Sequence, residues 1–330
     1  MREWFDHLGV PAPAGAVVGG RPDHRALRDR FGAVYVAKSP RGSAGNGTHL
    51  VRSAEEAAAL PERERWLVSE YVGDTAVNVH GFVGLDGLPQ VLRPSLQPTG
   101  VEAAGAGCGQ YAGCDFGAPE RLFPVAVRRC LDATERIGWA LAGLGYRGVF
   151  GAVFVLRDDR ALALEINCRM QGSSWLLGET ELERGDGRLP TPVRHVLERR
   201  GVPALGKPDP DRAEGVQLTV RHAGAPARAV RVPETGAYAL REGALVRRGD
   251  VAGLLECGPE ETVLVNLPPA GTLLHPDAVL ARLVTRRPLT APDGRTLRAG
   301  AASWSTPCTG STPSGCPARK VDAGARTPVP

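Results

Sequence analysis

Residues 119–167 constrain the fold more than any other part of the sequence. Apolar side chains recur at helical spacing from Pro119 to Gly145, and they keep to one face of the predicted helix. Two apolar runs follow, at 148–156 and 161–167, and a polar turn joins them. A one-faced helix next to two short strands is typical of an α+β architecture.

The first seventy-two residues repeat this mixture on a smaller scale. Strand patterns are expected at 16–20, ending at Lys38, at 49–51 and at 66–72. Helices are expected from Pro22 to Phe31 and after Ser53, where Glu56 stands at the capping-box position. We therefore predict that residues 1–72 form an α+β lobe with a mostly antiparallel sheet.

Three further segments follow. Residues 73–205 predict a second, larger lobe, with a hairpin at Asp86-Gly87, a Gly/Ala-rich loop at 99–117 and a last helix at 192–200. Beyond a Pro-rich linker, short alternating runs predict a small all-β domain over 212–300. Residues 301–330 are rich in Ser, Thr, Gly and Pro and predict a disordered tail.

Composition excludes several classes of function. Forty basic and thirty-six acidic residues give a net charge of only +4, and the basic residues are scattered, so we expect no nucleic-acid partner. No apolar run reaches the roughly 20 residues that span a bilayer, and the first nine residues are charged, so we expect a cytoplasmic protein without a membrane partner. The seven cysteines show no CxxC spacing and predict free thiols.

The first chemical candidate is a lysine followed by a glycine-rich loop. Lys38 ends a strand, and the loop from Ser39 to Thr48 contains Gly42, Gly45 and Gly47. Successive glycine N–H groups can cradle phosphates beside such a cation. A flexible hairpin loop with a lysine that binds nothing would give the same pattern. A Walker-type P-loop is excluded because the lysine precedes the glycines.

The second candidate is the run Glu165-Ile166-Asn167-Cys168-Arg169. On a strand, alternate residues share a face, so Glu165, Asn167 and Arg169 would converge on one side. A carboxylate and an amide oxygen suit Mg²⁺, and an arginine suits a phosphate or a carboxylate. A half-exposed edge strand would show the same alternation.

Taken together, these features resemble the ATP-grasp superfamily over about residues 1–200. The resemblance runs through LGVPAPAG, YVAKSPRGSAGNGTHLV, WLVSEYV and LALEINCRMQGSS, the last of which looks like that family's ExNxR signature. It implies two α+β lobes that grip ATP, with the glycine loop as a lid over the phosphates.

The resemblance also implies a role for each matching residue. Lys38 and the loop residues Gly42, Ser43, Gly45 and Gly47 would contact the phosphates. Glu70, Tyr71 and Val72 would form the hinge that holds the adenine. Glu165 and Asn167 would hold Mg²⁺, and Arg169 would bind an acyl phosphate or a substrate carboxylate. ATP and Mg²⁺ are thus the expected cofactors.

Two features depart from the family pattern. The family usually carries a second carboxylate ligand about a dozen residues before the ExNxR glutamate, and Val153 stands there. We therefore expect Val153 and Glu165 to lie on adjacent strands and metal binding to be weakened. The family also has a preceding α/β domain, so we expect either a fragment or a start at an internal methionine.

Other candidates have simpler interpretations. Asn78 and His80 share a strand face and could contact substrate, or His80 could be a hydrogen-bonded structural histidine. Cys108 and Cys114 lie in the Gly-rich loop, where a catalytic thiol would need a lowered pKa and a base.

The resemblance implies an ATP-dependent carboxylate–amine ligase that forms an amide through an acyl phosphate. The alternatives are a catalytically depleted nucleotide-binding protein and a biotin-carboxylase-like carboxylation. The expected partners are a small-molecule carboxylate and a small-molecule amine. The sequence names neither substrate, and it does not indicate an oligomeric state.

Overall fold

The fold is described from a computed structural model of the 330-residue chain. The structure describes residues 1–20, 23–42, 45, 47–62, 65–119, 123–183, 187–204, 214–230, 232–241, 244–298, 301 and 321–322. Ser43, the linker 206–211 and most of the segment 301–330 therefore lie outside the described residues. None of the helices in the described ranges is long and apolar enough to cross a membrane.

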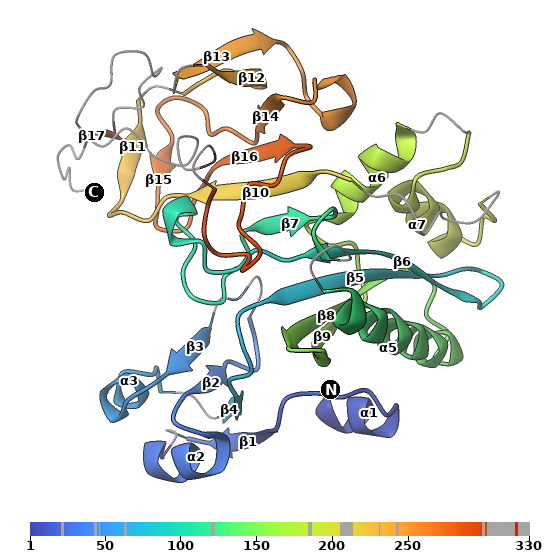
Figure 1. Ribbon diagram of the computed structural model, residues 1–330, viewed down its shortest axis with the longest axis vertical. Coiled ribbons are helices and arrows are strands. Elements are labelled where there is room, and N and C mark those ends of the chain that lie inside the picture. The colour runs from blue at the N-terminus through green and yellow to red at the C-terminus, as the bar shows by residue number, and fades with distance from the viewer. Residues whose placement is uncertain are drawn as a thin grey trace, which may run out of the picture.

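The small lobe is built on an antiparallel sheet of four strands in the order β1-β4-β2-β3 (Figure 1). The helix expected from Pro22 begins at His24, with Asp23 as its cap. As the sequence predicted, Ser53 caps the next helix, and its Oγ accepts the Glu56 N–H at 3.2 Å. Its elements are α1 (Arg2–His7), β1 (Gly15–Gly19), α2 (His24–Phe31), β2 (Tyr35–Lys38), β3 (Thr48–Val51), α3 (Ala54–Ala58) and β4 (Arg65–Glu70).

The large lobe forms one end of a ten-stranded sheet in the order β13-β12-β14-β16-β10-β7-β6-β5-β8-β9. The expected hairpin at Asp86-Gly87 joins β5 and β6. Its elements are β5 (Ala76–Val83), β6 (Pro89–Leu96), η1 (Glu102–Ala104), β7 (Gly113–Asp115), α5 (Pro124–Gly143), β8 (Gly148–Arg157), β9 (Arg160–Asn167), α6 (Ser174–Leu182) and α7 (Thr191–Arg199).

The sequence placed a helix start at Pro119, and Pro119 is helical in the structure. Residues 120–122 lie outside the described residues, and the long helix α5 begins at Pro124, which occupies its first turn. A single backbone bond, from the Phe123 N–H to Pro119 O, leads into it. Both prolines satisfy the rule for a helix start, and the apolar stripe cannot separate them because it begins only at Phe123.

The two faces of the large-lobe sheet differ in chemistry. One face of β5, β8 and β9 packs against α5 in a core that includes Val77, Phe150 and Phe154. Burying one such aromatic side chain contributes roughly 1.5–3 kcal/mol. The residues that alternate with these along the strands include Asn78, His80 and Glu165, so the opposite face is polar. This polar face is where the candidate site is built.

The C-terminal strands continue the large-lobe sheet. Val216 pairs with Asp115, so β10 lies against β7 and leads into the β-rich segment (Figure 1). The sequence analysis did not predict β7, because that strand is short and lies next to glycines. It did not predict β12 either. The elements are β10 (Val216–Arg221), β11 (Ala227–Ala229), β12 (Gly236–Arg241), β13 (Ala244–Gly249), η2 (Leu254–Glu256), β14 (Glu261–Val265), β15 (Leu273–Leu274), β16 (Val279–Thr285) and β17 (Val321–Asp322).

The expected boundaries at 1–72, 73–205, 212–300 and 301–330 stay predictions. The continuous sheet shows that segments 73–205 and 212–300 share a layer of strands. Within 301–330, Ala301 is buried at 4% exposure, and β17 pairs with β11.

Candidate active site

Lys38 stands at the end of β2, where Thr48 and Leu67 flank it in the ladder. Burial lowers the pKa of Lys38, and the Glu165 carboxylate opposes that shift. Lys38 belongs to the small lobe and Glu165 to the large lobe. The electrostatic interaction between them places the two charges near each other across the boundary between the lobes.

The loop after Lys38 is a closed turn. The Ser39 N–H donates to Gly47 O at 2.8 Å, and the Thr48 N–H donates to Gly45 O at 3.0 Å. Gly45 and Gly47 have φ of +85° and +80°, which favour glycine. Of the other loop residues predicted to contact phosphate, Gly42 is exposed, and Ser43 lies outside the described residues.

This loop contacts the second Gly-rich segment of the chain. A Cβ added to Gly45 would lie 2.1 Å from Gly109 O, and a Cβ added to Gly109 would lie 3.2 Å from Thr48 Cγ2. The two backbones touch because neither glycine has a side chain. The contact joins the glycine loop of the small lobe to the 99–112 segment of the large lobe.

The predicted hinge follows β4. The Ala14 N–H donates to Glu70 Oε1 at 2.7 Å, so the Glu70 carboxylate ties the start of β1 to the hinge. The backbone groups of Tyr71 and Val72 make no hydrogen bond to another described backbone group. Burial and a hydrogen bond to Asp74 raise the pKa of Tyr71 to about 12. The free backbone groups can pair with the edge of a planar base.

The end of β9 carries three linked polar side chains. Asn167 Nδ2 donates to Glu165 Oε1 at 3.0 Å, and Arg169 Nη2 donates to Asn167 Oδ1 at 3.1 Å. Glu165 and Arg169 are exposed, and Asn167 is half-buried. The three residues therefore converge, as the alternation of the strand predicted.

A row of side chains crosses four strands behind Glu165. Val153 pairs with Glu165 on one side and with Asn78 on the other, and Asn78 pairs with Ser95. The expectation that Val153 and Glu165 lie on adjacent strands is thus confirmed. Asn78 is 3% exposed, and its Oδ1 has no hydrogen-bond partner.

This donor set fits Mg²⁺ only in part. It offers the Glu165 carboxylate and the amide oxygens of Asn167 and Asn78, while Val153 contributes no ligand. Within the described ranges, no group of three His, Cys, Asp or Glu residues could hold a metal ion. Mg²⁺ commonly keeps one or two carboxylates and completes its shell with waters and substrate phosphates. The site therefore suits a metal ion that arrives with a nucleotide.

His80 is a buried residue that lies beneath the candidate site. The residue is fully buried, and its Nε2 lies 3.1 Å from Ser174 Oγ and 3.4 Å from Ser173 Oγ at the start of α6. Burial lowers the pKa of His80 to about 4, so the imidazole is neutral at physiological pH. These contacts support the interpretation of His80 as a structural histidine.

Gln171 is a site residue that the sequence analysis did not single out. A Cβ on Gly151 would lie 1.7 Å from Gln171 Nε2, so this amide lies directly over the backbone of β8. Gln171 Nε2 is buried without a hydrogen-bond partner. Gly151 pairs with both His80 and Asn167, which places Gln171 above the second polar row.

A donor-rich cluster lies beyond Gln171. Tyr111 contacts Gly172, and Arg221 Nη2 donates to Tyr111 O at 3.4 Å. Arg282 acts electrostatically on Tyr111, and Gln217 Oε1 accepts from Trp175 Nε1 at 2.6 Å. Arg221 Nε, Arg282 Nε and Gln217 Nε2 are buried without partners, whereas the Tyr111 hydroxyl interacts with the Cys114 side chain.

Unpartnered buried donors are rare in folded proteins and need an explanation such as a bound ligand or water. Here the orphaned groups of the cluster are all donors, and two of them are arginine nitrogens. Such a set suits an anion. One local signal for this cluster is Arg221, which ends the VQLTVR strand, but no local pattern places that strand beside β7.

The thiols of the Gly-rich loop show no sign of catalysis. Burial raises the pKa of Cys114 to about 12, which disfavours the thiolate. Cys108 is exposed, and no disulfide is formed by the cysteines that the structure describes.

Known proteins share sequence with part of this chain. No protein-family model matches it. The chain is 40% identical to L-propargylglycine–L-glutamate ligase of Streptantibioticus cattleyicolor over 134 residues, which cover 34% of this chain and 26% of the relative. The matched region thus spans about a quarter of that ligase.

Solved structures match most of the chain. The biotin carboxylase domain of Hydrogenobacter thermophilus 2-oxoglutarate carboxylase, solved with MgADP, ADP and bicarbonate, has a TM-score of 0.57 and 17% identity over 87% of this chain and 60% of that one. N5-carboxyaminoimidazole ribonucleotide synthetase of Thermotoga maritima has a TM-score of 0.57 and 15% identity, with 86% and 64% covered. Biotin carboxylase of Campylobacter jejuni has a TM-score of 0.55 and 13% identity, with 86% and 60% covered. These likenesses show that the chain has the ATP-grasp fold.

Proposed function

We propose that the chain acts as an ATP-dependent carboxylate–amine ligase that forms an amide through an acyl phosphate. The observation that carries the proposal is the interaction of Lys38 of the small lobe with Glu165 of the large lobe, whose carboxylate is linked through Asn167 to Arg169. The relative with 40% identity is named as a ligase of two amino acids, which supports the same chemistry.

Each residue has a role in this proposal. The backbone of Tyr71 and Val72 would bind the adenine, and Lys38 with the glycine loop would hold the phosphates. Glu165 and Asn167 would hold Mg²⁺, which neutralises charge on the transferred phosphoryl group when it is bound. Arg169 would orient the acyl phosphate.

The proposed reaction balances in two steps. A carboxylate oxygen of the substrate attacks the γ-phosphorus, an O–P bond forms, and the bond to the β-phosphate oxygen breaks to release ADP. The amine nitrogen then attacks the acyl carbon, a C–N bond forms, and the C–O bond breaks to release phosphate. The amine proton leaves with solvent or phosphate. Lys38 and Arg169 act by position and charge in both steps.

A carboxylation reaction is the second candidate, because the solved neighbours include carboxylases and one of them holds bicarbonate. In that case bicarbonate would take the place of the organic carboxylate. A depleted nucleotide-binding protein is the third candidate, and the absence of a carboxylate at Val153 favours it.

The test is product analysis with ATP, Mg²⁺ and a panel of amino acids that serve as carboxylate and amine. The ligase predicts ADP release that needs both partners, and an amide with the mass of the pair minus water. With an ¹⁸O-labelled carboxylate, one labelled oxygen should enter the released phosphate. Dependence on bicarbonate alone would indicate carboxylation, AMP release would contradict an acyl phosphate, and nucleotide binding without ADP release would indicate the depleted protein.

A further inference from the structure

The donor-rich cluster beyond Gln171 contains two arginines that no carboxylate balances. Arg221 and Arg282 lie on the adjacent strands β10 and β16, and neither forms an ion pair with a carboxylate in the described part of the chain. Arg221 Nη1 donates to Asp277 O at 3.2 Å and Nη2 to Tyr111 O at 3.4 Å. The Arg282 side chain makes no hydrogen bond to a described residue. Two such cations, each with a buried and unpaired Nε, favour the binding of an anion.

Gln217 adds a third donor whose direction is fixed. The residue lies on β10 and is 0% exposed. Its Oε1 accepts from the Trp175 indole N–H at 2.6 Å, and because an indole N–H can only donate, the amide oxygen must face Trp175. The amide Nε2 therefore points away from Trp175, and it is buried without a partner. Leaving this donor unpaired costs free energy unless a ligand or water satisfies it.

The donors lie on one face of the sheet. Cys114 on β7 pairs with Gln217, and Thr219, two residues along β10, pairs with Arg282 on β16. Alternation along the strands places the side chains of Cys114, Gln217 and Arg282 on the same face. Arg282 also acts electrostatically on Cys114 and on Tyr111. The unpaired donors therefore gather around Tyr111.

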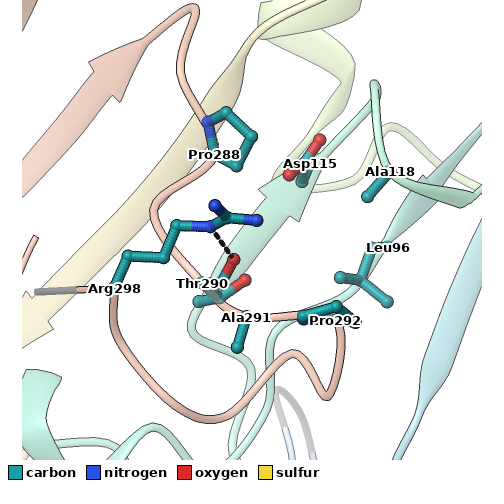
Figure 2. Close-up of a pocket in the computed structure, with 8 residues that line it drawn as sticks. All are labelled: Leu96, Asp115, Ala118, Pro288, Thr290, Ala291, Pro292 and Arg298. Carbon is teal, nitrogen blue, oxygen red and sulfur yellow. Dashed lines mark hydrogen bonds between the residues drawn. The ribbon is translucent and has the colours of Figure 1, made fainter. Parts of the chain in front are cut away.

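The acidic residue of β7 faces the other way. Asp115 follows Cys114 in the strand, so it projects from the opposite face of the sheet. There it lines a separate cavity together with Leu96 and Arg298 (Figure 2). The positive charge of the cluster is therefore not balanced by the carboxylate of β7.

The cluster is connected to the end of β9 by one short segment. Residues 169–175 carry Arg169, Gln171 and Trp175 in succession. Within this segment, a Cβ added to Gly172 would lie 3.2 Å from Tyr111 Cε1, so the backbone lies against the Tyr111 ring. A molecule bound at the cluster would thus lie along the same segment as Arg169.

We propose that the cluster binds the carboxylate of the amine substrate, which is therefore an amino acid. The proposal rests on the proposed function: Arg169 there orients the acid that is phosphorylated, so a second anion site serves the substrate that brings the amine. Arg282, Arg221 Nε and Gln217 Nε2 would donate to the carboxylate oxygens. A phosphate group suits the same donors, and the experiment separates the two ligands.

The test begins with a thermal-shift screen of the full chain against the proteinogenic L-amino acids, without ATP and Mg²⁺. A ligand that binds only the folded chain raises the melting temperature. The amino acid that gives the largest rise is then titrated by calorimetry, beside the amine that lacks its carboxylate and beside inorganic phosphate. We expect saturable binding of the amino acid and at least tenfold weaker binding of the amine.

Gln217→Glu gives the sharpest variant, because it supplies a carboxylate from the protein itself. Glutamate keeps an oxygen that accepts from Trp175 and places its second oxygen where Nε2 lies. We expect an equal or higher melting temperature and at least tenfold weaker amino-acid binding, since the new carboxylate occupies the site. A lower melting temperature with unchanged binding would indicate a merely structural role and would overturn the proposal.

Further variants locate the site and separate it from the ligase reaction. Arg282→Gln should weaken amino-acid binding about tenfold or more, and Arg241→Gln, at an exposed arginine on β12, should leave it unchanged. The proposal is overturned if no amino acid binds saturably, or if Arg169→Gln abolishes binding and Arg282→Gln does not. It is also overturned if Arg282→Gln weakens phosphate binding alone. Binding with the expected pattern, but no amide with ATP and Mg²⁺, would contradict the ligase and not the site.

Discussion

Val153 lies directly opposite Glu165 in the antiparallel ladder between β8 and β9. Directly opposed residues in such a ladder project on the same face of the sheet, with Cβ atoms about 4.5–5.5 Å apart. A carboxylate at position 153 would therefore stand beside the Glu165 carboxylate. The apolar side chain there leaves the proposed metal site with one acidic ligand among the described residues.

Restoring a carboxylate at this position should strengthen metal binding. Val153 is 4% exposed, so Val153→Asp buries a charge and should lower stability by about 1–3 kcal/mol without Mg²⁺. Added Mg²⁺ should restore the melting temperature and raise ATP turnover. Val153→Asn is the matched neutral control, and phosphate release is measured against Mg²⁺ concentration. If the wild type saturates at low Mg²⁺ and Val153→Asp slows it, other residues hold the metal.

The affinity of the protein for ATP should depend on the contact between Gly45 of the glycine loop and Gly109. Gly45→Ala places a Cβ 2.1 Å from Gly109 O, so one backbone must move. We expect ATP affinity to fall several-fold in fluorescence or calorimetric titration. Gly20→Ala is the control, because Gly20 also has a positive φ, of +64°, but no atom lies near its Cβ position. Equal losses in both variants would attribute the effect to backbone strain and not to the contact.

His80 should make folding stability depend on pH. The pKa of His80 falls from 6.5 to about 4 on folding, so the unfolded chain binds a proton that the folded chain excludes. The stability is fully present above pH 6.5 and is lost as pH falls toward 4, by about 3 kcal/mol at most. Denaturant unfolding at pH 7.5 and pH 5 measures the loss. His80→Gln should show a smaller difference between these pH values, and an equal difference would contradict the assignment.

The proposed hinge is linked to a residue from the segment that follows β16. Arg295 forms an ion pair with Asp74, which is hydrogen-bonded to Tyr71. The pair is more than one-third exposed, so its loss should cost less than about 1 kcal/mol of stability. Arg295→Gln and Asp74→Asn should each weaken ATP binding by a similar factor, and the double variant should add little, as expected for coupled residues. Additive losses in titrations of the three variants would show that the two residues act separately.

The sequence predicted the fold well where local patterns decide the structure. The apolar stripe of α5 and the short turn between β8 and β9 determine their packing, and the capping residue Ser53 determines one helix start. Pro119 and Pro124 carry the same local signal, and both are helical in the structure, with α5 beginning at Pro124.

The candidate site was predicted only where its residues are close in sequence. Glu165, Asn167 and Arg169 lie on one strand end, so their alternation indicates that they converge. Tyr111, Arg221 and Arg282 meet through pairing of β7, β10 and β16, which are far apart in the chain. No local pattern determines such long-range pairing, and this cluster appears only in the structure.

The central claim is that Lys38 and Glu165 act on one Mg²⁺–ATP complex from opposite sides of the cleft. The most direct test is calorimetric titration of ATP, with and without Mg²⁺, into the wild type, Lys38→Ala and Glu165→Gln. Lys38→Ala should weaken ATP binding about tenfold or more in both conditions, because a charge-assisted contact to phosphate contributes roughly 1.5–3 kcal/mol. Glu165→Gln should weaken it only when Mg²⁺ is present. Equal ATP affinity in the wild type and Lys38→Ala, or a Glu165→Gln effect that does not depend on Mg²⁺, would contradict the account.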